Sequence, residues 1–199
     1  MTSQTQPTDV TQLLSALRGG DKEAEERLFP IVYDELRRAA ARMLAGERVG
    51  HTFNPSDLVH EAWIRLGLRS EHGAEALPAS DRSHFLGLTI RAMRHVLIDH
   101  ARRRLAEKRG AGARRVTLDD GVEGGESSPE ELLGLFDAIE RLGLIDPRLR
   151  QVVEYRYLAG FTEEETAEML SVTTRTVQRD WVKARAWLYR QLYSPVTAS

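Results

Sequence analysis

Residues 173–183 carry side chains whose donors suit the edges of DNA bases and the phosphates of the backbone. Arg175, Gln178 and Arg179 have the forked donors that hydrogen-bond to guanine and adenine in the major groove. Threonine hydroxyls and the free amides at a helix start suit phosphate oxygens. We therefore expect one group of DNA contacts: Thr173, Thr174, Arg175, Thr176, Gln178, Arg179 and Lys183.

The sequence around these residues predicts a short helix, a tight turn and a second helix. Thr162 and Glu165 have the spacing of a capping box, which would open a helix that ends near Leu170. Residues 171–173 then form the turn, and Thr173 caps the next helix. This is the pattern of a helix-turn-helix, whose second helix enters the major groove. The remaining alternative is a helical hairpin with a solvated charged face.

A second basic segment lies in the middle of the chain. Residues 91–115 hold nine basic and two acidic residues, and residues 116–140 hold eight acidic residues and no basic one, although the whole chain has a net charge of only −2. A helix is expected over 81–109, with an apolar stripe of Leu86, Ile90, Met93, Leu97 and Ala101. On its other face we expect residues that follow phosphates: Arg91, Arg94, His95, Arg102 and Arg103.

A third candidate surface lies on a helix that begins at Asn54, a strong N-cap followed by a proline. Asp57, Glu61 and Arg65 are spaced one turn apart and share one face, opposite an apolar stripe. Such a stripe suits a charged partner surface, and His60 lies beside it. The alternative is a solvated face on which a Glu–Arg pair contributes only a few tenths of a kcal/mol.

Composition and periodicity predict an all-α protein. Its 199 residues contain no cysteine, so disulfides, thiolate metal sites and cysteine nucleophiles are excluded. With no apolar run approaching 18 residues and no secretory signal, we expect a cytoplasmic protein. Two small helical domains, 9–109 and 129–193, are expected, held apart by an acidic, glycine-rich flexible linker over 110–128. In the second domain, helices are expected over 129–142, 147–158, 163–170 and 174–192.

The six histidines do not form a recognisable catalytic or metal-binding pattern. His60 and Glu61 lack the partner histidine of a zinc protease, and His95 and His100 are five residues apart, off one helix face. The chain has no glycine-rich phosphate loop and no nucleophile elbow. We therefore expect no enzyme activity, no metal site and no cofactor.

Three segments, in order, carry a resemblance to a known family. They are residues 54–66 (NPSDLVHEAWIRL), the helix from Phe85 to Arg104, and residues 146–162 (DPRLRQVVEYRYLAGFT). Over about residues 10–192, the chain resembles bacterial RNA polymerase sigma factors of the extracytoplasmic-function (ECF) type, within the sigma-70 family. Four turn and helix positions depart from what is common there: Thr166, Ser171, Asp180 and Trp181.

The resemblance implies a role for each surface. A sigma-2-like domain would engage the −10 promoter element through the basic face of the long helix. It would dock on the clamp coiled coil of core RNA polymerase through Asp57, His60, Glu61 and Arg65. A sigma-4-like domain would read the −35 element through residues 173–183, contact the polymerase flap, and help the other domain open the duplex. An anti-sigma factor is a further partner that the resemblance suggests.

Alternatives remain for the linker and for the whole chain. The acidic linker is a plain tether, or it enters the template and RNA path of the polymerase, or it folds onto the basic 91–115 face and suppresses stray DNA binding. The chain as a whole has two rivals to a sigma factor. One is a sigma-like protein that binds only an anti-sigma factor, and the other is a dimeric helix-turn-helix repressor.

Overall fold

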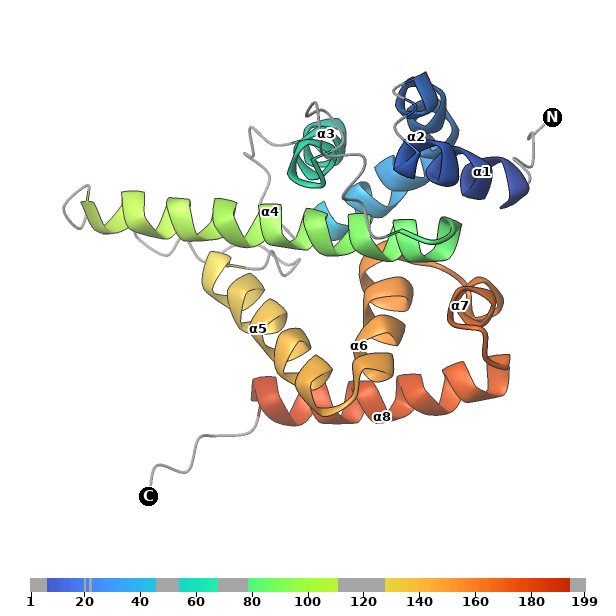
Figure 1. The fold of residues 1–199 in the computed structure, drawn as a ribbon. Coiled ribbons are helices and arrows are strands. Elements are labelled where there is room, and N and C mark those ends of the chain that lie inside the picture. Colours follow the sequence, from blue (N-terminus) through green and yellow to red (C-terminus); the bar gives the residue numbers. More distant parts are fainter. Residues whose placement is uncertain are drawn as a thin grey trace.

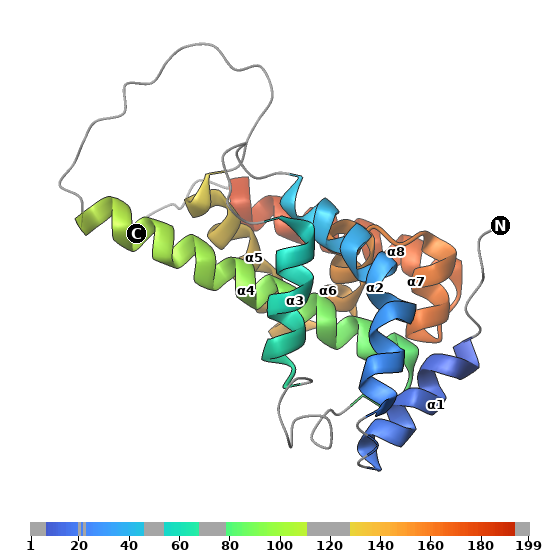
Figure 2. The same cartoon turned by 90° about the horizontal axis from the view of Figure 1, so that it is seen from above.

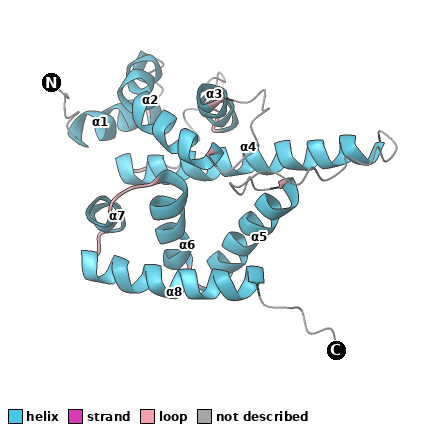
Figure 3. Cartoon of the chain, turned by 180° about the vertical axis from the view of Figure 1, so that it is seen from behind, coloured by secondary structure: helices cyan, strands magenta, loops and turns pink. Residues whose placement is uncertain are grey.

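The computed structural model describes residues 7–19, 21, 23–45, 54–67, 79–110 and 128–193 (Figure 1). Every regular element in these ranges is a helix (Figure 3), which confirms the all-α prediction. The elements are α1 (Pro7–Arg18), α2 (Glu23–Leu44), α3 (Pro55–Arg65), α4 (Arg82–Gly110), α5 (Pro129–Ile145), α6 (Pro147–Val153), the π-helical turn η1 (Glu154–Ala159), α7 (Glu163–Leu170) and α8 (Thr174–Tyr193).

The helix starts follow from local sequence. The Asn54 side chain accepts from the amides of Ser56 and Asp57, and the Asp57 carboxylate accepts from the Asn54 amide. Ser128 and Glu131 form the same reciprocal arrangement at the start of α5. Because these contacts satisfy amides that lack a partner within the helix, they fix where each helix begins.

Two elements differ from the expectation. Helix α1 had not been predicted. The helix expected over 147–158 changes at Val153 into the π-helical turn η1, which ends at Gly160 with a φ of +74°. The wider turn buries Glu154 and Tyr155 of η1, and both lie close to α4. Irregular turns of this kind are often found at functional positions.

The two halves of the chain pack together in this structure, and their division into two domains with a flexible linker stays a prediction. Figures 1 and 2 show α4 running between α2 and α3 on one side and α5 and α6 on the other. One apolar cluster includes Leu86 and Ile90 of α4 together with Phe136 and Ile139 of α5. Of the linker, residues 111–127 lie outside the described residues.

Helix α4 is buried along its apolar stripe as predicted. Leu86, Ile90 and Met93 have no exposed surface, and Leu97 and Ala101 are 1% and 3% exposed. Phe85 of α4 and Trp63 of α3 also belong to the core, with their rings 5.9 Å apart. The last turns of α4 extend past the end of α5 (Figure 1). One face of α4 thus completes the first half, and another contacts the second half.

Candidate nucleic-acid interface

The helix-turn-helix forms as the sequence predicts. The Thr162 hydroxyl accepts from the Glu165 amide at 3.1 Å, and the Glu165 carboxylate accepts from the Thr162 amide at 2.7 Å. A small core behind the turn joins α6, α7 and α8 through Val152, Ala167 and Val177, with three further residues packed against it: Leu170, Val172 and Trp181. This core sets the angle at which α8 leaves the turn.

The turn before α8 depends on a serine in a left-handed conformation. Ser171 has a φ of 52°, which is unfavourable for a residue with a Cβ and readily adopted by glycine. Two backbone hydrogen bonds hold it there, from Ser171 N–H to the Glu168 carbonyl and from Val172 N–H to the Ala167 carbonyl. The turn therefore keeps its shape at a cost in conformational energy.

The first turns of α8 present the predicted DNA-contacting side chains. Arg175, Gln178, Arg179 and Lys183 are exposed, as is Thr173, while Thr174 and Thr176 are half-buried. The Thr173 hydroxyl accepts from the Thr176 amide at 3.2 Å, so Thr173 is the cap that the sequence predicts. Gln178 donates to Glu163 of α7 at 2.7 Å, and a bond to a base would replace that contact.

Asp180 has a structural position within α8. Its side chain is 1% exposed, and one carboxylate oxygen accepts from Nε of Arg148 in α6 at 2.7 Å. The pair connects α8 to α6, and Nε of the exposed Arg179 lies 3.4 Å from the other carboxylate oxygen of Asp180. Thr166, another departure, is fully buried, and its hydroxyl has no hydrogen-bond partner. Both departures therefore act within the core of the helix-turn-helix.

The basic face of α4 is only partly accessible. Arg102 and Arg103 are exposed, and Arg91 and His95 are half-buried. Arg94 was predicted to follow phosphates, but its side chain has no exposed surface. It pairs with Glu140 of α5 and with Glu154 of η1, at 3.2 Å from the latter. The second half covers that side of α4 in this arrangement, and the phosphate contact of Arg94 stays a prediction.

Burial controls the titration of the groups in this contact. Desolvation raises the pKa of Glu154, and the cations Arg94 and Arg150 oppose that rise. Desolvation also lowers the pKa of Arg94, although a guanidinium keeps its proton in proteins. Burial and the nearby Arg94 charge lower the pKa of His95. In this desolvated contact between α4 and the second half, the pKa of each charged group therefore depends on its burial and on the charges beside it.

The predicted docking residues of α3 differ in what they contact. Asp57 is half-buried and serves the helix cap, while His60 and Glu61 are exposed. Arg65 pairs with Asp99 of α4 at 2.6 Å, an exposed contact between two helices of the first half. The accessible part of the predicted docking surface on α3 therefore consists mainly of His60 and Glu61.

Sequence reasoning missed the aromatic side chains beside this stripe. Phe29 lies 4.7 Å from Trp63 and 5.5 Å from His60, measured between ring centres. Together with Glu25 and Glu26 they line a surface groove of about 260 Å³. The Trp63 indole donates to Glu25 at 3.0 Å. Helical periodicity could have placed Phe29 on one face of α2, but only the packing of α2 on α3 brings its ring close to Trp63 and His60.

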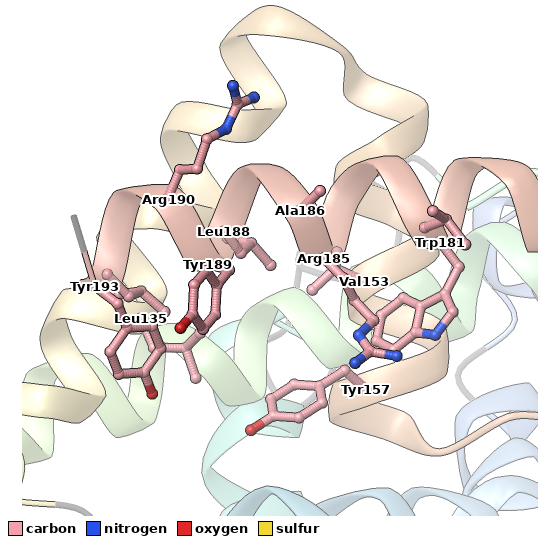
Figure 4. Close-up of a pocket in the computed structure, with 12 residues that line it drawn as sticks. Leu135, Val153, Tyr157, Trp181, Arg185, Ala186, Leu188, Tyr189, Arg190 and Tyr193 are labelled. Atoms are coloured by element: carbon pink, nitrogen blue, oxygen red, sulfur yellow. The ribbon is translucent and has the colours of Figure 1, made fainter.

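A larger apolar groove lies along α8, away from its reading end. Its volume is about 1080 Å³, and Figure 4 shows the aromatic and apolar side chains that line it. Tyr157, Tyr189 and Tyr193 are 58%, 67% and 70% exposed. The guanidinium of Arg185 lies 5.8 Å from the centre of the Trp181 ring at one end. Exposed aromatic residues with neighbouring arginines are typical of protein interfaces.

Comparison with known families decides the class of protein. Residues 7–194 match the family described as ECF sigma factor, which covers nearly the whole chain. The chain belongs to the ECF sigma factor family. This sigma factor is accordingly a DNA-binding transcription initiation factor that acts at promoters and partners with core RNA polymerase. No curated protein matches the chain.

The described residues of this sigma factor contain neither a membrane-spanning helix nor a metal-binding cluster. None of the helices there is long and apolar enough to cross a membrane. Likewise, no group of three or more histidine, aspartate or glutamate side chains in those ranges is arranged to hold a metal ion.

Proposed function

We propose that this sigma factor reads the −35 element with α8, engages the −10 element with α4, and helps open the duplex on core polymerase in the bacterial cytoplasm. The observation that carries the proposal is the exposed start of α8. Arg175, Gln178 and Arg179 project from the first turns of a helix that a capped turn and a small core hold in place. This is the part of a helix-turn-helix that enters the major groove.

The −10 contact rests on the exposed end of α4. Arg102 and Arg103 are available to phosphates in the structure as it stands. Arg91 and His95 are half-buried, and Arg94, which has no exposed surface, would reach DNA only if the second half moved away. Unstacking bases costs a few kcal/mol per step, so both halves must contribute binding energy to strand opening.

Docking on the polymerase clamp is assigned to α3. Glu61 and His60 are exposed there, and Asp57 stands at the helix start. The adjoining groove combines aromatic rings with the carboxylates of Glu25 and Glu26, which suits a basic side chain through ionic and cation–π contacts. Arg65 supports α3 through Asp99 and adds to the same face.

The flap of the polymerase is assigned to the apolar groove along α8 (Figure 4). This groove lies on the same helix as the reading face but nearer to its C-terminal end. One element of the polymerase could thus hold α8 while the helix start remains on DNA. An anti-sigma factor that binds this groove would compete for the same exposed aromatic residues, Tyr157, Tyr189 and Tyr193.

Transcription in vitro with purified core polymerase tests the proposal. The chain should direct initiation from a cognate promoter, and Glu61→Lys should abolish polymerase binding because it reverses the charge at the centre of the docking face. Glu164→Lys is the matched control, since Glu164 is an exposed acid on α7. A chain that binds promoter DNA as a dimer without polymerase would instead be a repressor. Binding to neither partner would leave the anti-sigma alternative.

A further inference from the structure

We propose that Arg148 of α6 is a further DNA contact of this sigma factor. The buried carboxylate of Asp180 holds Arg148 beside Arg179, so that one guanidinium meets the DNA backbone and the other meets a guanine. Neither Arg148 nor Asp180 belongs to the contacts expected for the −35 element. The inference rests on the proposed function of α8, and it names residues that set the affinity and the base preference of that helix.

The carboxylate of Asp180 joins two arginines from different helices. One oxygen accepts from Nε of Arg148 at 2.7 Å, and the other lies 3.4 Å from Nε of Arg179. The Asp180 side chain is 1% exposed, whereas the side chains of Arg148 and Arg179 are 45% and 59% exposed. A buried carboxylate of this kind needs a charged partner. Asp180 thus fixes the inner edges of two guanidinium groups that reach solvent.

The start of α6 places Arg148 at a fixed point beside α8. The Asp146 side chain accepts from the amides of Arg148 and Leu149 at 2.9 Å and 3.3 Å, which fixes the backbone there. Figures 1 and 3 show α6 beginning next to α8. Because Asp146 already occupies these two amides, the guanidinium of Arg148 is the group that this end of α6 offers to DNA.

Both arginines keep donors for a further partner. A guanidinium carries five N–H donors, of which only one is on Nε. In each arginine it is Nε that faces Asp180, and among the described residues the Nη atoms of Arg148 and Arg179 have no hydrogen-bond partner. The two Nη atoms form a fork that binds two oxygens of a phosphate or the O6 and N7 atoms of guanine. Each fork is therefore held in place and remains available.

The charge balance of this group favours an anionic partner. One arginine neutralises the buried Asp180, and the second leaves one positive charge at the surface. The exposed Arg175 and Lys183 add to the positive charge of the same helix. A carboxylate alone would repel phosphates, so an aspartate on a DNA-reading helix is tolerated here because two arginines outweigh it.

The helix that carries each arginine decides which part of DNA it meets. Arg179 lies on the helix that enters the major groove, where a forked arginine contact with guanine is the commonest specific one. Arg148 comes from α6, which lies beside α8 instead of in the groove, so its fork meets the sugar-phosphate backbone. Arg148 consequently contributes affinity on every sequence, and Arg179 selects guanine at one −35 position.

The first test removes the charge of Arg148 with Arg148→Gln, whose side-chain amide can still donate to Asp180. The full chain is bound to core polymerase, and the probe is a promoter duplex that the unmodified holoenzyme selects from a pool randomised over the −35 element. We expect the slope of log affinity against log salt to fall by about 1, with every −35 sequence weakened alike. Arg141→Gln is the matched control, since Arg141 is an exposed arginine on α5 that pairs with Asp137.

The second test releases Arg179 with Asp180→Asn, which keeps the shape of the side chain and removes its charge. The preference for guanine over other bases at the Arg179 position should fall about tenfold, because the fork is no longer held. Affinity for sequences that lack this guanine should not fall. Asp137→Asn on α5 is the matched control. An equal loss on all sequences would show that Asp180 acts only on stability, which overturns its positioning role.

A measurement on the unmodified chain decides the positioning role if Asp180→Asn fails to keep its helices by circular dichroism. The Nε protons of Arg148 and Arg179 should exchange with solvent more slowly than that of the exposed Arg175, because Asp180 accepts from them. Nuclear magnetic resonance of the arginine side chains gives these rates. Exchange as fast as that of Arg175 would overturn the proposed arrangement.

The outcomes distinguish this inference from the function on which it rests. If the unmodified holoenzyme selects no promoter from the pool, the sigma function is contradicted, and the inference fails with it. If the holoenzyme selects a promoter but Arg148→Gln leaves the salt slope unchanged, the backbone contact is overturned while the sigma function stands. A base other than guanine at the Arg179 position likewise overturns the second part of the inference alone.

Discussion

Helices α4 and α8 are both basic and amphipathic, yet they stand in opposite situations. The start of α8 is exposed because its apolar side alone packs, on α5, α6 and α7. Helix α4 packs on two sides, against α3 and against the second half. Arg179 of α8 is therefore exposed, whereas Arg94 of α4 has no surface in solvent. A basic face is a candidate for DNA only if no other element covers it.

The acidic residues near the two helices show the same difference. Asp180 is buried on α8 itself and pairs with Arg148, which connects α8 to α6; its other carboxylate oxygen lies 3.4 Å from Nε of Arg179, whose side chain stays exposed. Glu154 belongs to η1 and pairs with Arg94, an arginine of the basic helix α4 in the other half. The Asp180–Arg148 pair leaves the exposed side chains of α8 accessible, whereas the Glu154–Arg94 pair buries one arginine of the basic face of α4.

The largest expected effect separates two arginines of α4. Arg94→Met should lower the free energy of unfolding by about 3 kcal/mol, because it leaves buried Glu154 without its main partner. Arg102→Met, on the exposed end of the same helix, should change it by less than about 0.5 kcal/mol. Urea denaturation followed by circular dichroism measures both. Equal effects would mean that the Arg94 contact contributes nothing to stability.

The next effect tests the reading face of α8. Arg179→Ala should reduce promoter affinity by about 1–3 kcal/mol and relax the base preference at one −35 position, because an arginine reads a base edge through two donors. Binding to a set of single-base promoter variants gives the measurement. A uniform loss on every sequence would show that Arg179 contacts phosphate only.

A smaller effect concerns the turn that orients α8. Ser171→Gly should raise the free energy of unfolding by about 1 kcal/mol, since glycine adopts a φ of 52° without the Cβ penalty. Thermal melts measure the gain, with Ser171→Ala as the control that keeps the Cβ. A loss of stability in the glycine variant would mean that the serine side chain makes a compensating contact.

The smallest effect distinguishes phosphate contacts from base contacts. Arg103→Ala on α4 should weaken DNA binding uniformly across sequences and reduce the slope of log affinity against log salt by about 1. Titrations at several salt concentrations provide that slope. If the loss depended on sequence instead, the end of α4 would also read bases, and the contrast with α8 would disappear.

Local sequence was sufficient for the helices and the reading face. The capping residues Asn54, Thr162 and Thr173 determine helix starts through contacts within four residues, so spacing alone predicts them. The exposed side chains of the α8 start follow from helical periodicity in the same way. The π-helical turn at Glu154 has no comparable local signal, and the sequence reads there as an ordinary helix.

The accessibility of Arg94 was decided by tertiary structure alone. Its place on α4 follows from periodicity, but its partners lie 46 and 60 positions further along the chain. The sequence determined an all-α protein with a helix-turn-helix, because those features arise from nearby residues. The closed contact between the halves depends on glycines and charges that meet only after folding, so no local pattern contains it.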